Sequence, residues 1–203
     1  LTAGPRGRAV KGLPEGANGL TALGKALSEL WESMPQPKKA VAASVNPAAL
    51  EVLEAAFRQY VGEPVLLIGR DLPLPIDTEL AEPSSTGVDR LCTAAAAFDQ
   101  LGVACVVADF GTATTIDCVN DKGVFLGGAI LPGLEMQARS LADRTAQLPL
   151  VEPAEPESAF GKDTRQAILS GLINSARGAL RELVESYATE LGHWPIVVTT
   201  GGN

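Results

Sequence analysis

The sequence predicts an α/β fold. Short apolar runs rich in β-branched residues alternate with longer segments in which apolar residues recur at helical spacing. The run at residues 103–108 is apolar throughout, which is typical of a strand buried on both faces. With 203 residues, 46% of them hydrophobic, the chain can bury a proper core in one large domain or two small ones.

The first part of the chain, residues 1–86, is predicted to form one domain. Residues 1–18 are rich in Gly, Pro and basic side chains and are expected to form a loop. Apolar side chains at helical spacing then alternate with short apolar runs, which gives the order helix, strand, helix, strand. The predicted helices span residues 20–31 and 50–60, and the predicted strands span 40–45 and 65–68.

The second predicted domain, residues 87–203, opens with a helix at 91–98 and continues into a three-strand meander. The predicted strands are 103–109, 114–119, 124–130 and 195–200, and the later helices are 133–142 and 164–190. The first domain looks like a partial copy of the second that lacks the meander. This element order is similar to the actin-like ATPase and sugar-kinase superfamily, whose duplicated ribonuclease H-like domains each place a β-meander at a nucleotide-binding cleft.

Composition narrows the choice of partner and compartment. The net charge of -8, with no basic cluster beyond Lys38 and Lys39, argues against nucleic acid or an anionic membrane surface as a partner. No apolar run approaches membrane-spanning length. Cys92, Cys105 and Cys118 lie in apolar surroundings without metal-ligand spacing, which indicates buried reduced thiols and a cytoplasmic protein. The expected partner is a small molecule.

The most informative segment is residues 103–119, in which two strands are joined by a turn of Gly, Thr and acid. Gly111 permits close backbone approach to a ligand, and amide groups and threonine hydroxyls can donate hydrogen bonds to phosphate oxygens. Asp109, where the first strand ends, can hold a cation that offsets phosphate charge. An ordinary hairpin with a polar turn fits this segment equally well.

Four segments in order resemble the type III pantothenate kinase family. They are Gly87-Val-Asp89-Arg90, the run from Asp109 to Asp117, Gly127-Gly128 through Pro132-Gly133, and Gly161-Lys-Asp163-Thr164. Ser44-Val45-Asn46-Pro47 before them and Thr200-Gly201-Gly202 after them extend the likeness. The resemblance implies ATP-dependent phosphorylation of pantothenate to 4'-phosphopantothenate, the first step of coenzyme A biosynthesis, by a homodimer.

The resemblance also implies a role for individual residues. It makes Asp89 the proton acceptor for the pantothenate hydroxyl, and it assigns substrate contacts to Gly87, Val88, Asp89, Arg90 and Thr164. It assigns Thr112 to the ATP phosphates and Asp109 to a monovalent cation, potassium or ammonium, with magnesium accompanying ATP. Asp117 has no assigned role beyond a polar strand position, and His193 is expected in a solvated loop.

Local chemistry also offers plainer interpretations. An acid such as Asp89 at the start of a helix can simply complement the helix dipole, and Arg90 can be a surface arginine. Either Asp163 or Thr164 can cap the helix that begins there. Gly127-Gly128 and Pro132-Gly133 suit anion binding or tight packing equally.

The chain also departs from the family. The usual Asp-x-Gly-Asn-Thr phosphate loop is absent, and together with the start at Leu1 this predicts that an upstream segment has been removed or left out. Two other functions remain open. One is a regulatory protein without kinase activity, like the Bvg accessory factors of the same family, and the other is a non-kinase ATPase of the superfamily.

Overall fold

The computed structural model describes residues 17–202, which form two compact units of α/β type, one with a parallel sheet and one with a mixed sheet. The N-terminal unit comprises the described residues up to Pro73 together with Gly87–Asp89, and the C-terminal unit comprises Leu74–Thr86 and the chain from Arg90 onward. The loop predicted over residues 1–18 lies almost entirely outside the described residues, and residues 17 and 18 already belong to the first helix.

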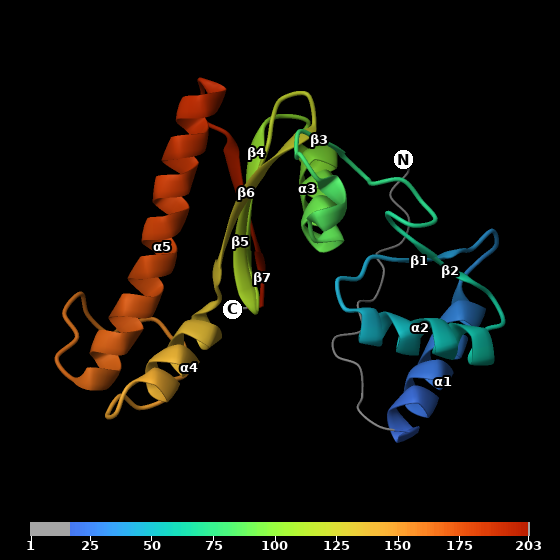
Figure 1. The fold of residues 1–203 in the computed structure, drawn as a ribbon, viewed down its shortest axis with the longest axis horizontal. Coiled ribbons are helices and arrows are strands. Elements are labelled where there is room, and N and C mark those ends of the chain that lie inside the picture. Colours follow the sequence, from blue (N-terminus) through green and yellow to red (C-terminus); the bar gives the residue numbers. More distant parts are fainter. Residues whose placement is uncertain (1–16, 203) are drawn as a thin grey trace. The chain divides into compact units, whose positions relative to one another are not determined.

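The N-terminal unit packs two helices, α1 (Ala17–Ser33) and α2 (Pro47–Tyr60), against two parallel strands, β1 (Ala40–Ala42) and β2 (Val65–Leu67) (Figure 1). Its core forms around Phe57, Val65 and Leu67. The Trp31 and Phe57 rings meet edge to face, with centroids 6.0 Å apart. The predicted order of helices and strands is therefore confirmed here.

The strand predicted over residues 40–45 ends at Ala42, opposite Leu67, the last residue of its partner β2, and the helix α2 begins at Pro47. Asn46 is the N-cap, and its side chain accepts a hydrogen bond from the Ala49 amide at 3.1 Å. Pro47 occupies the first helical turn, where a missing N–H costs nothing. Capping therefore accounts for Asn46 and Pro47 in the Ser-Val-Asn-Pro segment.

The C-terminal unit is built on a five-stranded sheet in the order β3-β6-β5-β4-β7. The strands β4 (Cys105–Phe110), β5 (Ala113–Val119) and β6 (Val124–Pro132) form the predicted antiparallel meander, and β7 (Ile196–Gly201) joins β4 in parallel. The two-residue strand β3 (Asp77–Thr78), which pairs with the start of β6, was not predicted. A short 3-10 helix, η1 (Pro83–Ser85), follows it.

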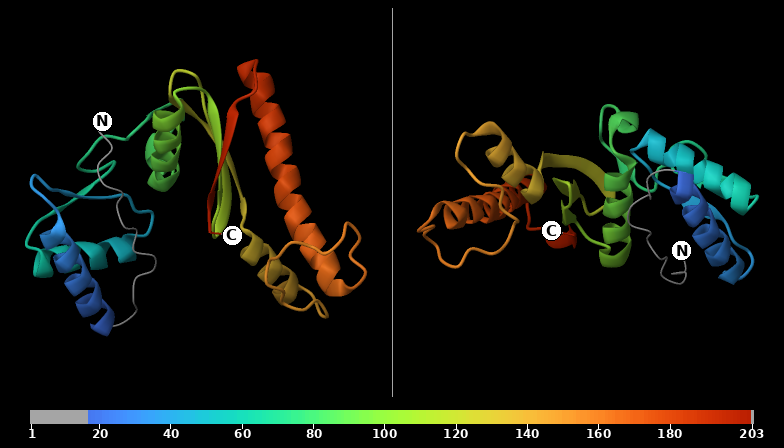
Figure 2. Two further views of the ribbon diagram at one scale, coloured as in Figure 1. Left: turned by 180° about the vertical axis from the view of Figure 1, so that it is seen from behind. Right: turned by 90° about the horizontal axis from the view of Figure 1, so that it is seen from below.

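Two helices cover opposite faces of this sheet (Figures 1 and 2). The helix α3 (Val88–Leu101) buries Leu91 and Ala94 against Val107, Val119 and Phe125. On the other face, α5 (Thr164–Leu191) buries Val184 in a cluster with strand residues that alternate with the first set: Val106, Ala108, Ile116 and Cys118. The period of two along each strand therefore divides the core into two layers.

The helix α4 (Leu134–Arg144) follows β6 and packs beside the first half of α5 (Figure 1). A third apolar cluster joins Leu134 and Ala138 of α4 to Leu169 and Leu172 of α5, with Val151 from the intervening loop. Asp163 caps α5, and Gly192 ends it in the left-handed conformation with φ 78°. These contacts fix where α4 begins, directly beside the β4–β5 turn.

Candidate functional site

The turn between β4 and β5 is surrounded by glycine backbone. Gly133, the N-cap of α4, donates its N–H to the Thr112 carbonyl at 3.1 Å, and Gly202 donates to the Phe110 carbonyl at the same distance. A Cβ at Gly133 would lie 2.8 Å from the Thr112 carbonyl carbon and closer still to the Gly111 and Thr112 oxygens. Gly133 therefore permits a contact that any side chain would prevent.

Gly201 has the same kind of role on the other side of the turn. Its φ is 115°, and a Cβ there would lie 2.6 Å from the backbone carbon of Phe110. Two chain segments distant in sequence, at Gly133 and at Gly201–Gly202, therefore reach the turn with backbone alone, and Thr112 is exposed at its tip. An exposed turn built of backbone amides and a threonine hydroxyl suits a phosphate group.

Asp109 lies beside this turn, on β4, and pairs in register with Thr115 of β5 and Thr200 of β7. By alternation with Cys105 and Val107, its side chain lies on the α3 face of the sheet. A Cβ on Gly111 would lie 3.7 Å from Asp109 Oδ1 and 3.5 Å from the Ala113 carbonyl oxygen, so both oxygens border Gly111. This all-oxygen donor set suits a hard monovalent or divalent cation.

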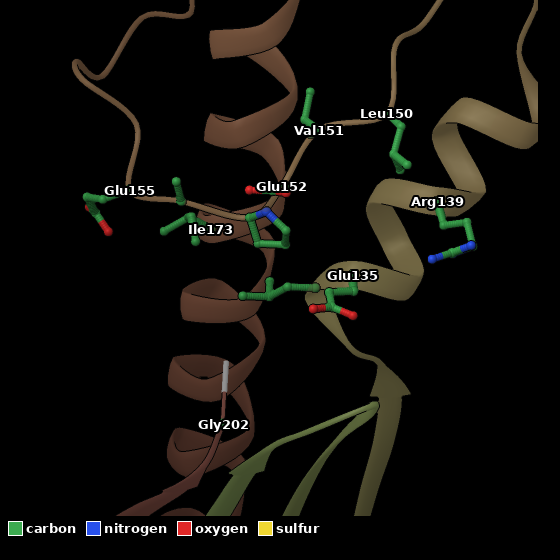
Figure 3. Close-up of a pocket in the computed structure, with 11 residues that line it drawn as sticks. Glu135, Arg139, Leu150, Val151, Glu152, Glu155, Ile173 and Gly202 are labelled. Atoms are coloured by element: carbon green, nitrogen blue, oxygen red, sulfur yellow. The ribbon is translucent and has the colours of Figure 1, made fainter. Parts of the chain in front are cut away.

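A cavity of about 680 Å³ lies next to the turn, between α4, α5 and the loop that joins them. In Figure 3, Glu135 and Arg139 of α4 line one side, Glu152 and Glu155 of the loop line the other, and Gly202 lies at one end. Glu155 also forms a salt bridge with Arg177 at 3.0 Å. Even with Glu155 paired to Arg177, the carboxylates of Glu135 and Glu152 outnumber the single Arg139, so the turn itself is the better phosphate site.

The start of α3 carries the predicted catalytic motif. A Cβ at Gly87 would meet Asp89 Oδ1 at 2.5 Å and the Val45 side chain at 3.4 Å. Gly87 therefore leaves room for the Asp89 carboxylate and lies against the loop between β1 and α2. Gly87, Val88 and Asp89 all belong to the N-terminal unit, and Arg90, the next residue, belongs to the C-terminal one.

Arg90 is paired with a residue that the sequence analysis left without a role. Its Nε lies 3.1 Å from both carboxylate oxygens of Asp117, and its Nη2 donates to Oδ1 as well. The Arg90 Cζ lies 5.7 Å from the centroid of the Phe125 ring. Asp117 is only 3% exposed, so the structure contains a buried, bidentate ion pair at this position.

Thr164 is the first residue of α5, but it is Asp163 that caps the helix, accepting from the Gln166 amide at 2.8 Å. Thr164 is exposed and lines a largely apolar groove of about 810 Å³ between α4 and α5, with Met136, Leu141, Gly171 and Ser175. The structure thus brings Asp109 and Thr112 together at one turn. Thr164 and Arg90 lie on helices that cover opposite faces of the sheet.

The histidine and the cysteines lie outside the proposed substrate and phosphate contacts. His193 is exposed as expected, and its Nε2 pairs with Asp121 Oδ2 at 2.7 Å, which raises the pKa of the histidine. The cysteines are free thiols, and burial raises the pKa of Cys118 to about 11, so it stays protonated near neutral pH. Among residues 17–202, no group of three or more His, Cys, Asp and Glu side chains is placed to hold a metal ion.

Within the described residues, every helix is too short or too polar to cross a bilayer.

Comparison with known proteins places the chain in a family. A family model described as type III pantothenate kinase matches residues 10–186. Proteins named type III pantothenate kinase are similar to the chain: that of Syntrophotalea carbinolica is 37% identical over 162 residues and that of Anaeromyxobacter dehalogenans 38% over 162. Each alignment covers 80% of this chain, which spans 64% of each relative's length.

A solved structure gives an independent comparison of the fold. It is a Campylobacter jejuni protein described as a Baf family transcriptional activator, with a TM-score of 0.52 and 19% identity over 87% of this chain and 81% of that one. At this identity the likeness concerns the fold alone. The family model, which matches most of the chain, decides membership, and the chain belongs to the type III pantothenate kinase family.

Proposed function

We propose that the protein carrying this chain transfers the γ-phosphate of ATP to pantothenate, giving 4'-phosphopantothenate for coenzyme A biosynthesis. The observation that supports this most strongly is the β4–β5 turn, where glycine backbone from two distant segments leaves Thr112 exposed beside Asp109, in a chain of this family. Phosphoryl transfer depends mainly on positioning and charge stabilisation, and a rigid turn with backbone donors provides both.

In this mechanism each of the predicted site residues has a separate role. Asp89 accepts the proton of the pantothenate hydroxyl as it attacks, and Gly87 leaves room for that carboxylate. Arg90 contacts the pantothenate carboxylate through its fork of donors. Val88 is the remaining substrate contact beside Arg90. Thr164 is proposed as a substrate contact from its family position alone, because α5 and α3 cover opposite faces of the sheet. The Thr112 hydroxyl and the turn amides hold the ATP phosphates.

Cations fit the same turn. The Asp109 carboxylate and the Ala113 carbonyl, which border Gly111, are oxygen donors of the kind that potassium, ammonium or magnesium would contact, and a bound cation would offset phosphate charge there. Asp109 is proposed for the monovalent ion. Magnesium is proposed to arrive with ATP, since it usually binds through substrate phosphates and one or two carboxylates.

The wider proposals follow the family. The chain would carry two ribonuclease H-like domains of an actin-like ATPase fold, residues 1–86 and 87–203, the first without its β-meander. The enzyme would be cytoplasmic, in keeping with its free cysteines. A homodimer is supported by the apolar groove between α4 and α5, where Met136 is 47% exposed. Sedimentation equilibrium would test the dimer.

A coupled assay of ADP release with and without pantothenate tests the activity. Release that requires pantothenate, with 4'-phosphopantothenate detected by mass spectrometry, is the expected result. ADP release that ignores pantothenate would instead favour a non-kinase ATPase. Absence of both nucleotide hydrolysis and product would favour a regulatory protein.

A further inference from the structure

We propose that Asp117 is a positioning residue that holds the guanidinium of Arg90 in one orientation for the substrate carboxylate. The proposal rests on the function proposed above. It assigns a role to an acidic residue that neither touches the reacting atoms nor belongs to the predicted substrate contacts.

The geometry of the pair supports orientation. Asp117 receives hydrogen bonds from both Nε and Nη2 of Arg90, so the carboxylate meets one edge of the planar guanidinium side-on. The Phe125 ring, which is fully buried, lies 5.7 Å from Arg90 Cζ and limits its movement on another side. The Arg90 side chain is only 15% exposed, so its long stem has few alternative rotamers.

The sheet is shaped to admit this carboxylate. Asp117 of β5 lies opposite Gly128 of β6, and a Cβ at Gly128 would lie 2.7 Å from Asp117 Cα and closer still to its Oδ1. Any other residue at 128 would displace the carboxylate that Arg90 contacts. The glycine therefore makes room for the ion pair.

Stability alone explains this pair poorly. Apolar contacts of Leu91 and Ala94 with Val107, Val119 and Phe125 already pack α3 on the sheet. Burying two charges costs desolvation, and buried ion pairs can often be replaced by apolar residues without loss of stability. Arg90 directly follows Asp89, the proposed proton acceptor. A role in the substrate site therefore explains the ion pair better than stability does.

A guanidinium carries five N–H donors along more than one edge, so side-on pairing with Asp117 is compatible with contact to a second carboxylate. Fixing the orientation beforehand lowers the entropy lost when that carboxylate binds. The expected signature of losing Asp117 is therefore weaker use of pantothenate, with little change in the use of ATP.

The test compares Asp117→Asn with Asp99→Asn, the same chemical change at an exposed position on α3. Asp117→Asn should raise the KM for pantothenate at least about tenfold, because the charge-assisted pair that orients Arg90 for the pantothenate carboxylate is lost. It should change the KM for ATP less than about twofold, because Arg90 does not contact ATP. Asp99→Asn should leave both constants within about twofold of the wild-type values.

Coupling to Arg90 identifies the mechanism. Arg90→Lys keeps the positive charge beside Asp117 but cannot pair side-on, so it should also raise the KM for pantothenate. In the Arg90→Lys background, adding Asp117→Asn should change that KM less than about twofold. If Asp117→Asn does not fold, Arg90→Lys decides alone, and a wild-type KM for pantothenate would overturn the proposal.

Other outcomes also overturn it: a folded Asp117→Asn protein with an unchanged KM for pantothenate, or equal increases in both KM values, or additive effects in the double variant. The proposed function is tested separately on the wild type. If the wild type shows no pantothenate-dependent ADP release, the affinity for pantothenate measured by calorimetric titration replaces KM. Weaker binding of pantothenate by Asp117→Asn than by the wild type then supports the positioning role. No binding of pantothenate by the wild type overturns both proposals.

Discussion

Gly133→Ala should disable the β4–β5 turn while leaving the rest of the C-terminal unit folded. Ordinary van der Waals contact begins near 3.4 Å, but the new Cβ would lie 2.8 Å from the Thr112 carbonyl carbon and closer to two carbonyl oxygens. The turn must therefore retreat by more than about 0.6 Å. A misplacement approaching 1 Å costs about a hundredfold in rate, so kcat/KM for ATP should fall roughly 10- to 100-fold.

The same overpacking should lower the free energy of unfolding by about 1–3 kcal/mol. ADP release with ATP varied at saturating pantothenate measures the first effect, and thermal melting by circular dichroism measures the second. Gly178→Ala is the matched control, because nothing lies within 4 Å of its new Cβ and the position is an exposed helical turn of α5. It should raise stability by about 0.5–1 kcal/mol and leave kcat/KM unchanged. A Gly133→Ala enzyme with wild-type kcat/KM for ATP would refute the phosphate role of this turn.

Three further changes test separate parts of the site. Asp89→Asn should lower kcat on the order of a hundredfold or more while calorimetry shows nearly unchanged pantothenate binding, since the amide keeps the shape but cannot accept the proton; wild-type turnover would make Asp89 only a helix-end acid. Asp109→Ala should abolish the preference for potassium over sodium in initial rates, and a wild-type enzyme with no preference would remove that assignment. His193→Gln should flatten the pH dependence of the melting temperature above pH 6.5. Asp121 raises the His193 pKa, so this stabilisation is present below the ordinary pKa of 6.5 and is lost as pH rises through the folded value; an unchanged profile would contradict it.

The long elements of the fold could be predicted because their signals are local. The helix α5 begins at an aspartate cap and ends at a glycine, and the meander strands are continuous apolar or alternating runs. The strand β3 could not be predicted, because two residues are too few to show an alternation of apolar and polar side chains. Its pairing with β6 depends on residues that are distant in sequence. The strand β1 is shorter than predicted, since it ends where its partner β2 ends, and that pairing cannot be read from the local sequence.

The candidate site was predictable where glycine and threonine mark a turn, but the burial of Asp117 depends on tertiary packing. One feature of the local sequence indicates this burial. Asp117 lies two residues before Val119, a core residue, so both side chains should lie on the same face of the strand. A carboxylate on the core face of a strand needs a cationic partner. The partner, Arg90, is 27 residues away in sequence, so it can be identified only once the position of α3 on the sheet is known.

The pairing of Asp117 with Gly128 was hidden by a β-bulge. Val119 pairs with Phe125, and regular continuation of that register would place Asp117 opposite Gly127. The register shifts between Cys118 and Val119, so Asp117 lies opposite Gly128 instead. Gly127 has a φ of 116°, which favours glycine, and Gly128 leaves the space that the carboxylate fills. Two adjacent glycines that suited either anion binding or tight packing thus have different structural tasks. One allows the irregular backbone at the bulge, and the other makes room for the acid that pairs with Arg90.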